Sequence, residues 1–121
     1  PRVARYRAWG ERAAFVTDSR ALIAAFAEDP VVATREAYAL LRAMAADAGV
    51  AYDTPAHARI AALAHGFGGA AKPSGAGGGD IAVAIIPDPD AGARVALAAA
   101  AEGLLPIAVQ VVPGICRMRS N

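Results

Sequence analysis

The residues best suited to chemistry gather in one segment, Lys72-Pro73-Ser74-Gly75-Ala76-Gly77-Gly78-Gly79-Asp80. Four of the 12 glycines lie in this segment, and Lys72 is the only lysine of the chain. Because glycine has no Cβ, successive backbone N–H groups can be approached closely and can converge on an anion. A charge-assisted hydrogen bond contributes about 1.5–3 kcal/mol, so these N–H groups, the Ser74 hydroxyl and the Lys72 ammonium predict a phosphate-binding loop.

Two better-known glycine motifs do not fit this segment. A P-loop needs a Lys-Ser/Thr pair that leads into a helix, and a dinucleotide-binding motif needs a third glycine where Asp80 stands. The residues after Asp80 have the pattern of a strand, so no helix dipole adds to the loop. A tight hairpin turn without a ligand, where two backbones pass closely, is an alternative that composition alone leaves open.

The other reactive side chains have ordinary structural explanations. His57 and His65 lie in one predicted helix without a third ligand, so no metal site is predicted. Cys116 has no histidine near it in the sequence, which favours packing over nucleophilic chemistry. Asp88 and Asp90 fit helix capping. The N-terminal arginines form either a solvated face or a contact with a phosphate or another domain: Arg2, Arg5, Arg7 and Arg12.

Helices are predicted where a short polar residue and a proline precede an apolar segment and a glycine follows it. The polar side chain caps the first turn, proline fits the first helical position, and glycine adopts the left-handed conformation past the end. This pattern occurs from Asp29-Pro30 to Gly49, from Thr54-Pro55 to Gly66 and from Asp88-Pro89 to Gly103. An earlier helix is predicted from about Ala13 to Ala27.

Strands are predicted in the apolar runs Ile81–Ile86 and Ile107–Val112. Ala70–Lys72 is expected to form a hairpin with the first run around the glycine loop. Val3–Trp9 is a further candidate strand, although strand alternation would place two arginines and Trp9 on one face. This order predicts an α+β fold, an antiparallel sheet with helices packed on one face.

Composition and charge exclude several classes of protein. The 121 residues are 56% hydrophobic, as expected of one domain with a core. A net charge of +1 without a concentrated basic face argues against nucleic acid as a partner. No window of about 20 residues is free of charged side chains, as a membrane-spanning helix requires. The sequence also has no signal-peptide pattern. The expected location is therefore the cytoplasm.

The string from Lys72 to Asp80 resembles the third conserved motif of the GHMP kinases, and within this superfamily it is most similar to that of the bacterial phosphomevalonate kinases. The neighbouring elements follow the family's order, with a Thr54-Pro55 helix before the motif and a strand after it. Trp9-Gly10 resembles the family's Trp-Thr-Gly segment. The resemblance covers most of the chain and is strongest from about Thr54 onward.

The resemblance implies that residues 1–121 form a single ferredoxin-like C-terminal domain. It implies that Ser74, Gly75 and Ala76 lie near the phosphoryl acceptor or the transferred phosphate, that Lys72 and Asp80 frame the loop, and that Gly77, Gly78 and Gly79 complete it. The implied reaction transfers the γ-phosphate of ATP, with Mg²⁺, to 5-phosphomevalonate in isoprenoid synthesis. Such chemistry relies on positioning and charge stabilisation, which N–H groups and a lysine provide.

The family's nucleotide loop, Pro-x-Gly-Leu-Gly-Ser-Ser-Ala, does not occur in this sequence. The N-terminal nucleotide-binding domain is therefore expected to be absent from the chain, as in an excised domain or the product of a split gene. Alone, the chain is expected to lack kinase activity and to hold neither ATP nor Mg²⁺. Its expected partners are that domain and a small phosphorylated substrate. The alternatives are a GHMP kinase acting on mevalonate or a sugar, and a non-catalytic ligand-binding module of the same fold.

Overall fold

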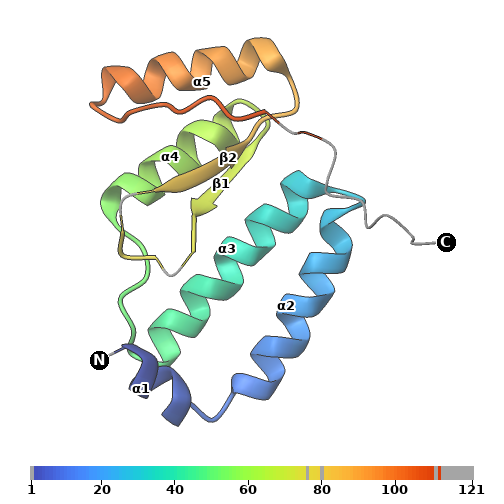
Figure 1. The fold of residues 1–121 in the computed structure, drawn as a ribbon, viewed down its shortest axis with the longest axis vertical. Coiled ribbons are helices and arrows are strands. Elements are labelled where there is room, and N and C mark those ends of the chain that lie inside the picture. The colour runs from blue at the N-terminus through green and yellow to red at the C-terminus, as the bar shows by residue number, and fades with distance from the viewer. Residues whose placement is uncertain (1, 76, 80, 111, 113–121) are drawn as a thin grey trace, which may run out of the picture.

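The computed structural model describes residues 2–75, 77–79, 81–110 and 112, which form five helices and a two-stranded antiparallel sheet (Figure 1). α2 and α3 lie side by side as a helical hairpin, and α3 also contacts β1. α4 packs against both strands and against α5. In chain order the elements are α1 (Arg2–Ala8), α2 (Arg12–Phe26), α3 (Pro30–Asp47), α4 (Pro55–Gly66), β1 (Ala70–Pro73), β2 (Ala82–Ile85) and α5 (Pro89–Ala101).

The predicted capping side chains, Asp29, Thr54 and Asp88, accept hydrogen bonds from backbone N–H groups at the starts of α3, α4 and α5. The Asp29 carboxylate accepts a hydrogen bond from the Val32 N–H at 2.9 Å in the first turn of α3. At the start of α5, the Asp88 carboxylate accepts from the Asp90 N–H at 3.0 Å. Each of α3, α4 and α5 also has proline in its first turn, where the missing N–H costs no hydrogen bond. The capping prediction for these three helices is confirmed.

The sequence predicts a glycine in the left-handed conformation just after each of these helices. This prediction is confirmed for α3 and α5, whereas after α4 a later glycine has that conformation. Gly49 after α3 and Gly103 after α5 have φ values of +65° and +83°. After α4, however, Gly66 is the last helical residue and Gly68 has the positive φ, +79°. The helix continues to Gly66 because nothing in a glycine forces the left-handed conformation, and a second glycine two residues later permits it.

The predicted hairpin is confirmed, with Ala70 opposite Ile85 and Pro73 opposite Ala82. β1 is nearly buried, and α3 is fastened to its start because the Arg35 guanidinium donates to the Gly69 carbonyl at 2.8 Å. A Cβ at Gly69 would lie 2.4 Å from the Ile85 carbonyl oxygen, so glycine is required where the strands approach. The hairpin thus holds both ends of the glycine loop in fixed positions.

The core consists largely of small side chains. Tyr38, Ala45 and Tyr52 form one buried cluster, against which Leu41 and Ala61 pack. Small side chains let α3 and α4 lie close to the strands, although each alanine buries little apolar area. The other buried hydrophobic residues are Ala33, Ala64, Ala70, Ala71, Val95 and Ala99.

The predicted strand Val3–Trp9 is wrong, because these residues lie mainly in α1. Helical spacing places the Tyr6 and Trp9 rings on one side, with centroids 6.1 Å apart, and both rings pack against Phe15 of α2. The Trp9 indole N–H also donates to the Asp47 carboxylate at the end of α3. A helix therefore gathers the aromatic residues that a strand would have placed on opposite faces.

The predicted strand Ile107–Val112 is also not found, since its described residues, 107–110 and 112, have no strand structure. Ile107 and Val109 are 70% and 84% exposed. A β-branched run fits a pleated, half-buried surface but becomes a strand only where a neighbour pairs with it. The α+β class is confirmed, whereas a ferredoxin-like sheet would need more than the two strands described.

No helix among the described residues combines the length and the apolar character needed to cross a membrane.

Candidate functional site

The predicted site is the loop that joins β1 to β2, beside the segment connecting α3 to α4 (Figure 1). Two of the predicted residues, Ala76 and Asp80, lie outside the described part of the chain. The described residues that the prediction singled out follow one another from the end of β1 into the loop: Lys72, Ser74, Gly75, Gly77, Gly78 and Gly79.

The loop is shaped by left-handed backbone and by contact with Tyr52. Gly75, Gly77 and Gly78 have φ values of +76°, +68° and +62°, a conformation that side-chain-bearing residues rarely adopt. A Cβ at Gly77 would lie 2.3 Å from both the ring and the carbonyl oxygen of Tyr52. The Gly78 N–H donates to that same Tyr52 carbonyl. Tyr52 therefore supports the loop from one side.

Not every N–H of the loop is free to bind an anion. The Gly78 N–H is bound to Tyr52, and the Ser74 N–H donates to the Ile81 carbonyl at 2.9 Å, which continues the hairpin by one pair. The N–H groups of Gly75, Gly77 and Gly79 have no acceptor among the described residues. The anion-binding capacity of the described loop thus rests on three glycines and on nearby side chains.

Positive charge reaches the loop from two directions. The Lys72 ammonium is half-buried, donates to the Pro73 carbonyl at 3.0 Å and forms no ion pair with a described carboxylate. From α1, the Arg2 guanidinium donates to the Gly77 carbonyl at 3.0 Å and touches Gly78. Arg5 instead donates to the Gly49 carbonyl after α3. One member of the N-terminal arginine cluster is therefore a loop contact, and another fastens α1 to α3.

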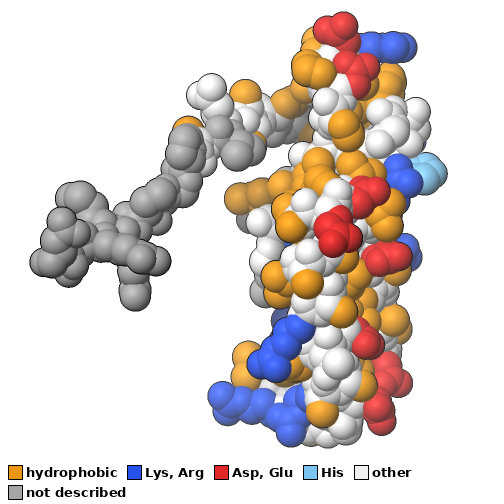
Figure 2. Space-filling view, turned by 90° about the vertical axis from the view of Figure 1, so that its right-hand side faces the viewer, with side chains coloured by type: hydrophobic (Ala, Val, Ile, Leu, Met, Phe, Trp, Pro, Cys, Tyr) orange, Lys and Arg blue, Asp and Glu red, His pale blue; other side chains and the backbone are white. Residues whose placement is uncertain are grey.

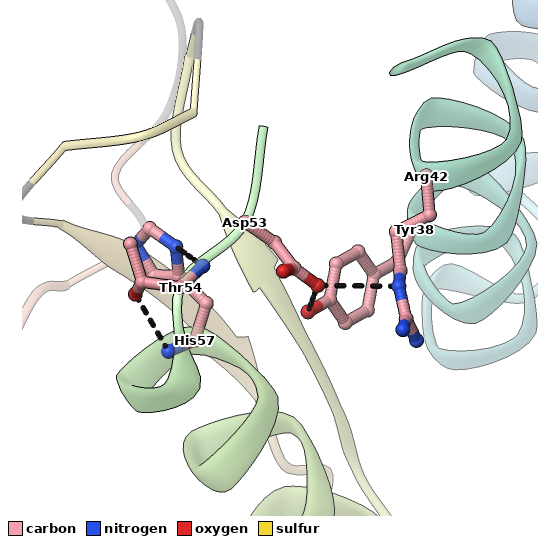
Figure 3. Close-up of polar contacts among 5 residues, drawn as sticks. All are labelled: Tyr38, Arg42, Asp53, Thr54 and His57. Carbon is pink, nitrogen blue, oxygen red and sulfur yellow. Dashed lines mark hydrogen bonds and ion pairs between the residues drawn. The ribbon is translucent and has the colours of Figure 1, made fainter. Parts of the chain in front are cut away.

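A polar cluster that sequence reasoning missed holds the segment before α4 against α3 (Figure 3). The Tyr38 hydroxyl donates to the Asp53 carboxylate at 2.6 Å, and the Arg42 guanidinium lies 3.2 Å from the same carboxylate oxygen. Arg42 also lies over the Tyr38 ring, 5.4 Å from its centroid. Burial, and then the hydrogen bond and negative charge of Asp53, raise the pKa of Tyr38 to about 12. Tyr38 is therefore a neutral donor at physiological pH.

Tyr52 links this polar cluster to the glycine loop. Its side chain is 5% exposed, and its ring lies 6.4 Å from that of Tyr38, measured between centroids. Burial and the nearby charge of Asp53 raise the pKa of Tyr52. The Tyr52 hydroxyl has no hydrogen-bond partner among the described residues. Nothing in the sequence indicates that Asp53 and Tyr52 support the loop.

The two histidines have no metal-binding arrangement. The His57 N–H donates to the Thr54 hydroxyl at 3.3 Å, and the His57 Nδ1 accepts from the Thr54 N–H at 3.3 Å, so both residues form a reciprocal cap on α4 (Figure 3). His65 is exposed near the end of that helix. The described residues include no group of three His, Cys, Asp or Glu side chains that could hold a metal ion.

Comparison with known proteins supports the resemblance at the level of the family. Residues 22–104 match the family model described as GHMP kinases C terminal. The crystal structure of a Lin0012 protein from Listeria innocua has a similar fold, with a TM-score of 0.72 and 24% sequence identity. That likeness covers 84% of this chain but 32% of the Listeria chain, so this chain spans about a third of that structure. No match was found among curated proteins.

Proposed function

The chain belongs to the GHMP kinase family of ATP-dependent kinases, since more than half of it matches the family's C-terminal domain, and from this premise we propose that it provides the substrate side of a phosphomevalonate kinase. The acceptor is then 5-phosphomevalonate, which receives the γ-phosphate of ATP. The observation that carries this proposal is the string from Lys72 to Asp80. The left-handed glycine backbone of this loop supports it, because such backbone exposes N–H groups to an anion.

The loop's proposed task is to bind and orient phosphate oxygens. The N–H groups of Gly75, Gly77 and Gly79, which have no acceptor among the described residues, would donate to the substrate, while Ser74 contributes a hydroxyl. Lys72 and Arg2 would offset the negative charge that accumulates when two phosphorylated molecules meet. Ala76 and Asp80 belong to the proposed site through the family resemblance.

ATP and Mg²⁺ are assigned to a separate N-terminal domain, which is the proposed protein partner. Because the described residues present no metal-ligating cluster, no step is assigned to a metal on this chain. Supplied alone with ATP, Mg²⁺ and 5-phosphomevalonate, the chain should release no ADP above the blank. Acceptor-dependent ADP release by the isolated chain would contradict this division of the active site.

The direct test is a titration of the chain with 5-phosphomevalonate, followed by ¹H–¹⁵N NMR. We expect the amide signals of Gly75, Gly77 and Gly79 to move together and to saturate. Mevalonate and a sugar phosphate serve as matched ligands that separate the acceptor from its relatives. If the loop signals stay fixed while signals elsewhere move, the loop is a structural turn and the proposal fails.

Catalysis can be tested when the chain is combined with a GHMP N-terminal domain. Lys72→Met and Ser74→Ala should then lower turnover by at least 10-fold while changing the melting temperature little. Arg59→Met is a matched control, because Arg59 is exposed and its ion-pair partner is Glu102 at the end of α5, which is not part of the loop. Equal losses of melting temperature and activity in the two loop variants would favour a purely structural loop.

A further inference from the structure

A cavity of about 360 Å³ lies between α2 and α3 and extends to Lys72 of β1. Its walls are mainly apolar, because Leu22 and Phe26 line it from α2 and Leu40 and Leu41 line it from α3. This volume falls within the range of about 300–1,000 Å³ that is usual for small-molecule sites. The cavity is distinct from the glycine loop, although Lys72 is common to both.

The apolar walls of this cavity continue onto the surface of the molecule. α2 is 15 residues long and buries none of its side chains. At the rim of the cavity, Ile23 is 74% exposed and Phe26 is 47% exposed. Hydrophobic side chains accordingly reach the surface on the side of the molecule drawn in Figure 2. An exposed apolar surface of this kind is typical of a binding site.

Among the described residues that line the cavity, Lys72 is the only charged one. A lysine ammonium has three N–H donors, and the hydrogen bond to the Pro73 carbonyl uses one of them. No carboxylate among the described residues forms an ion pair with it. Ser19 of α2 and the buried Thr34 of α3 add hydroxyl groups to the lining. The described lining thus combines apolar walls with one cationic side chain.

We propose that this cavity binds an amphipathic anion, a molecule with an alkyl or acyl chain of medium length and one carboxylate or phosphate head. The chain would lie between α2 and α3 against Leu22, Phe26 and Leu41, and the head would bind Lys72. Charge complementarity selects this class, because an uncharged apolar ligand leaves the ammonium without a counter-ion and a cationic one places two like charges together. The proposal is independent of which acceptor the glycine loop binds.

The test uses octanoate and octyl phosphate as probes, with octylamine as the ligand of opposite charge, and follows the chain by ¹H–¹⁵N NMR. We expect both anions to move amide signals in residues 19–26 and 33–41 and to saturate, whereas octylamine produces no saturable shift. Comparison of the two anions establishes which head group is preferred. Inorganic phosphate alone should leave the amide signals of these two helices unchanged. If it moves the amide signals of the loop glycines, that result concerns the kinase proposal and not the cavity.

Three variants separate the contributions of charge and space. Lys72→Met should weaken octanoate binding at least 10-fold by removing the cation. Ala37→Leu, which fills part of the cavity and keeps Lys72, should weaken both anions by a similar factor. Arg20→Met removes an exposed charge from α2 outside the cavity lining and should change the affinity less than twofold. Circular dichroism confirms that each variant is folded before it is compared, and Ala37→Leu provides the test if Lys72→Met does not fold.

Two results would overturn the proposal. Equal binding of octanoate and octylamine, or full affinity in folded Lys72→Met, would show that the cation does not select the ligand. Signals of α2 and α3 that respond to protein concentration, but not to either anion, would show instead that a second copy of the chain covers this face.

Discussion

The two sides of α3 are packed in different ways. The side toward β1 and the connection to α4 carries Tyr38 and Ala45 in a buried cluster with Tyr52, and it is tied by the hydrogen bond to Asp53. The side toward α2 meets a helix that buries none of its residues and leaves a cavity. Two buried tyrosines, the small Ala45 and a specific hydrogen bond therefore make the side toward β1 tight, while Ile23 of α2 stays exposed. Side-chain size alone does not show where this domain is tightly packed.

The largest effect is expected where the tight side meets the glycine loop. Gly77→Val would place a side chain against Tyr52 in a left-handed backbone, and should lower the free energy of unfolding by about 2–4 kcal/mol. Gly75→Ala is the matched control, because its φ is also positive but a Cβ there would meet no described atom within 4 Å, so backbone strain alone should cost about 1–2 kcal/mol. Urea unfolding measures both, and equal losses would show that Tyr52 does not support the loop.

A pH dependence should come next in size. The pKa of Tyr38 is about 12 in the folded chain, whereas the ordinary value, expected in the unfolded chain, is 10. The unfolded chain therefore loses this proton first as the pH rises. The stabilisation is complete below pH 10 and is lost between pH 10 and 12, by about 2–3 kcal/mol. Urea unfolding at pH 9 and pH 11.5 measures the loss. Tyr38→Phe should flatten the profile, and a variant with the wild-type slope would contradict the assignment.

Substitution of the two buried tyrosines compares a hydroxyl that forms a hydrogen bond, in Tyr38, with one that has no partner among the described residues, in Tyr52. Tyr38→Phe removes a hydrogen bond to a charged carboxylate and should cost about 1–2 kcal/mol at pH 7. Tyr52→Phe removes a hydroxyl that has no partner among the described residues, so stability should be unchanged or rise by up to about 1 kcal/mol. Thermal unfolding of both variants compares them directly. A larger loss for Tyr52→Phe would mean that its hydroxyl is bonded in solution.

The smallest effect is expected on the open side. Ile23→Ser changes an exposed side chain of α2 and should alter the free energy of unfolding by less than about 0.5 kcal/mol. Ala45→Ser, at a buried position of α3, should cost about 1–2 kcal/mol through burial of a hydroxyl. Chemical denaturation of the pair checks the difference. Similar losses would show that α2 is packed as firmly as the other side.

Sequence reasoning succeeded where the determining signals are local. Asp29 and Asp88 lie two or three residues from the N–H groups they cap, and the hairpin strands are separated only by the glycine loop. Side chains and backbone groups this close in sequence meet whatever the rest of the chain does. The helices α3, α4 and α5 and the pairing of β1 with β2 were predictable for this reason.

The errors and omissions come from contacts between distant residues. Arg2 reaches Gly77, which lies 75 positions away, and the partners Trp9 and Asp47 are 38 positions apart. The helix α1 is not predicted from the sequence, because the packing of Tyr6 and Trp9 against Phe15 of α2 is a tertiary contact. The residues of the loop were identified by their pattern, but its support by Tyr52 depends on tertiary packing that no short pattern records.

A chain with one lysine carries one side-chain amine for acylating reagents to modify. Lys72 is that amine, and it stands where the glycine loop and the cavity between α2 and α3 meet. Mass spectrometry of a single peptide can therefore follow its labelling rate, without competing signals from other lysines. Slower acetylation in the presence of a compound would locate that compound beside Lys72, which gives this domain a simple chemical screen for its own ligands.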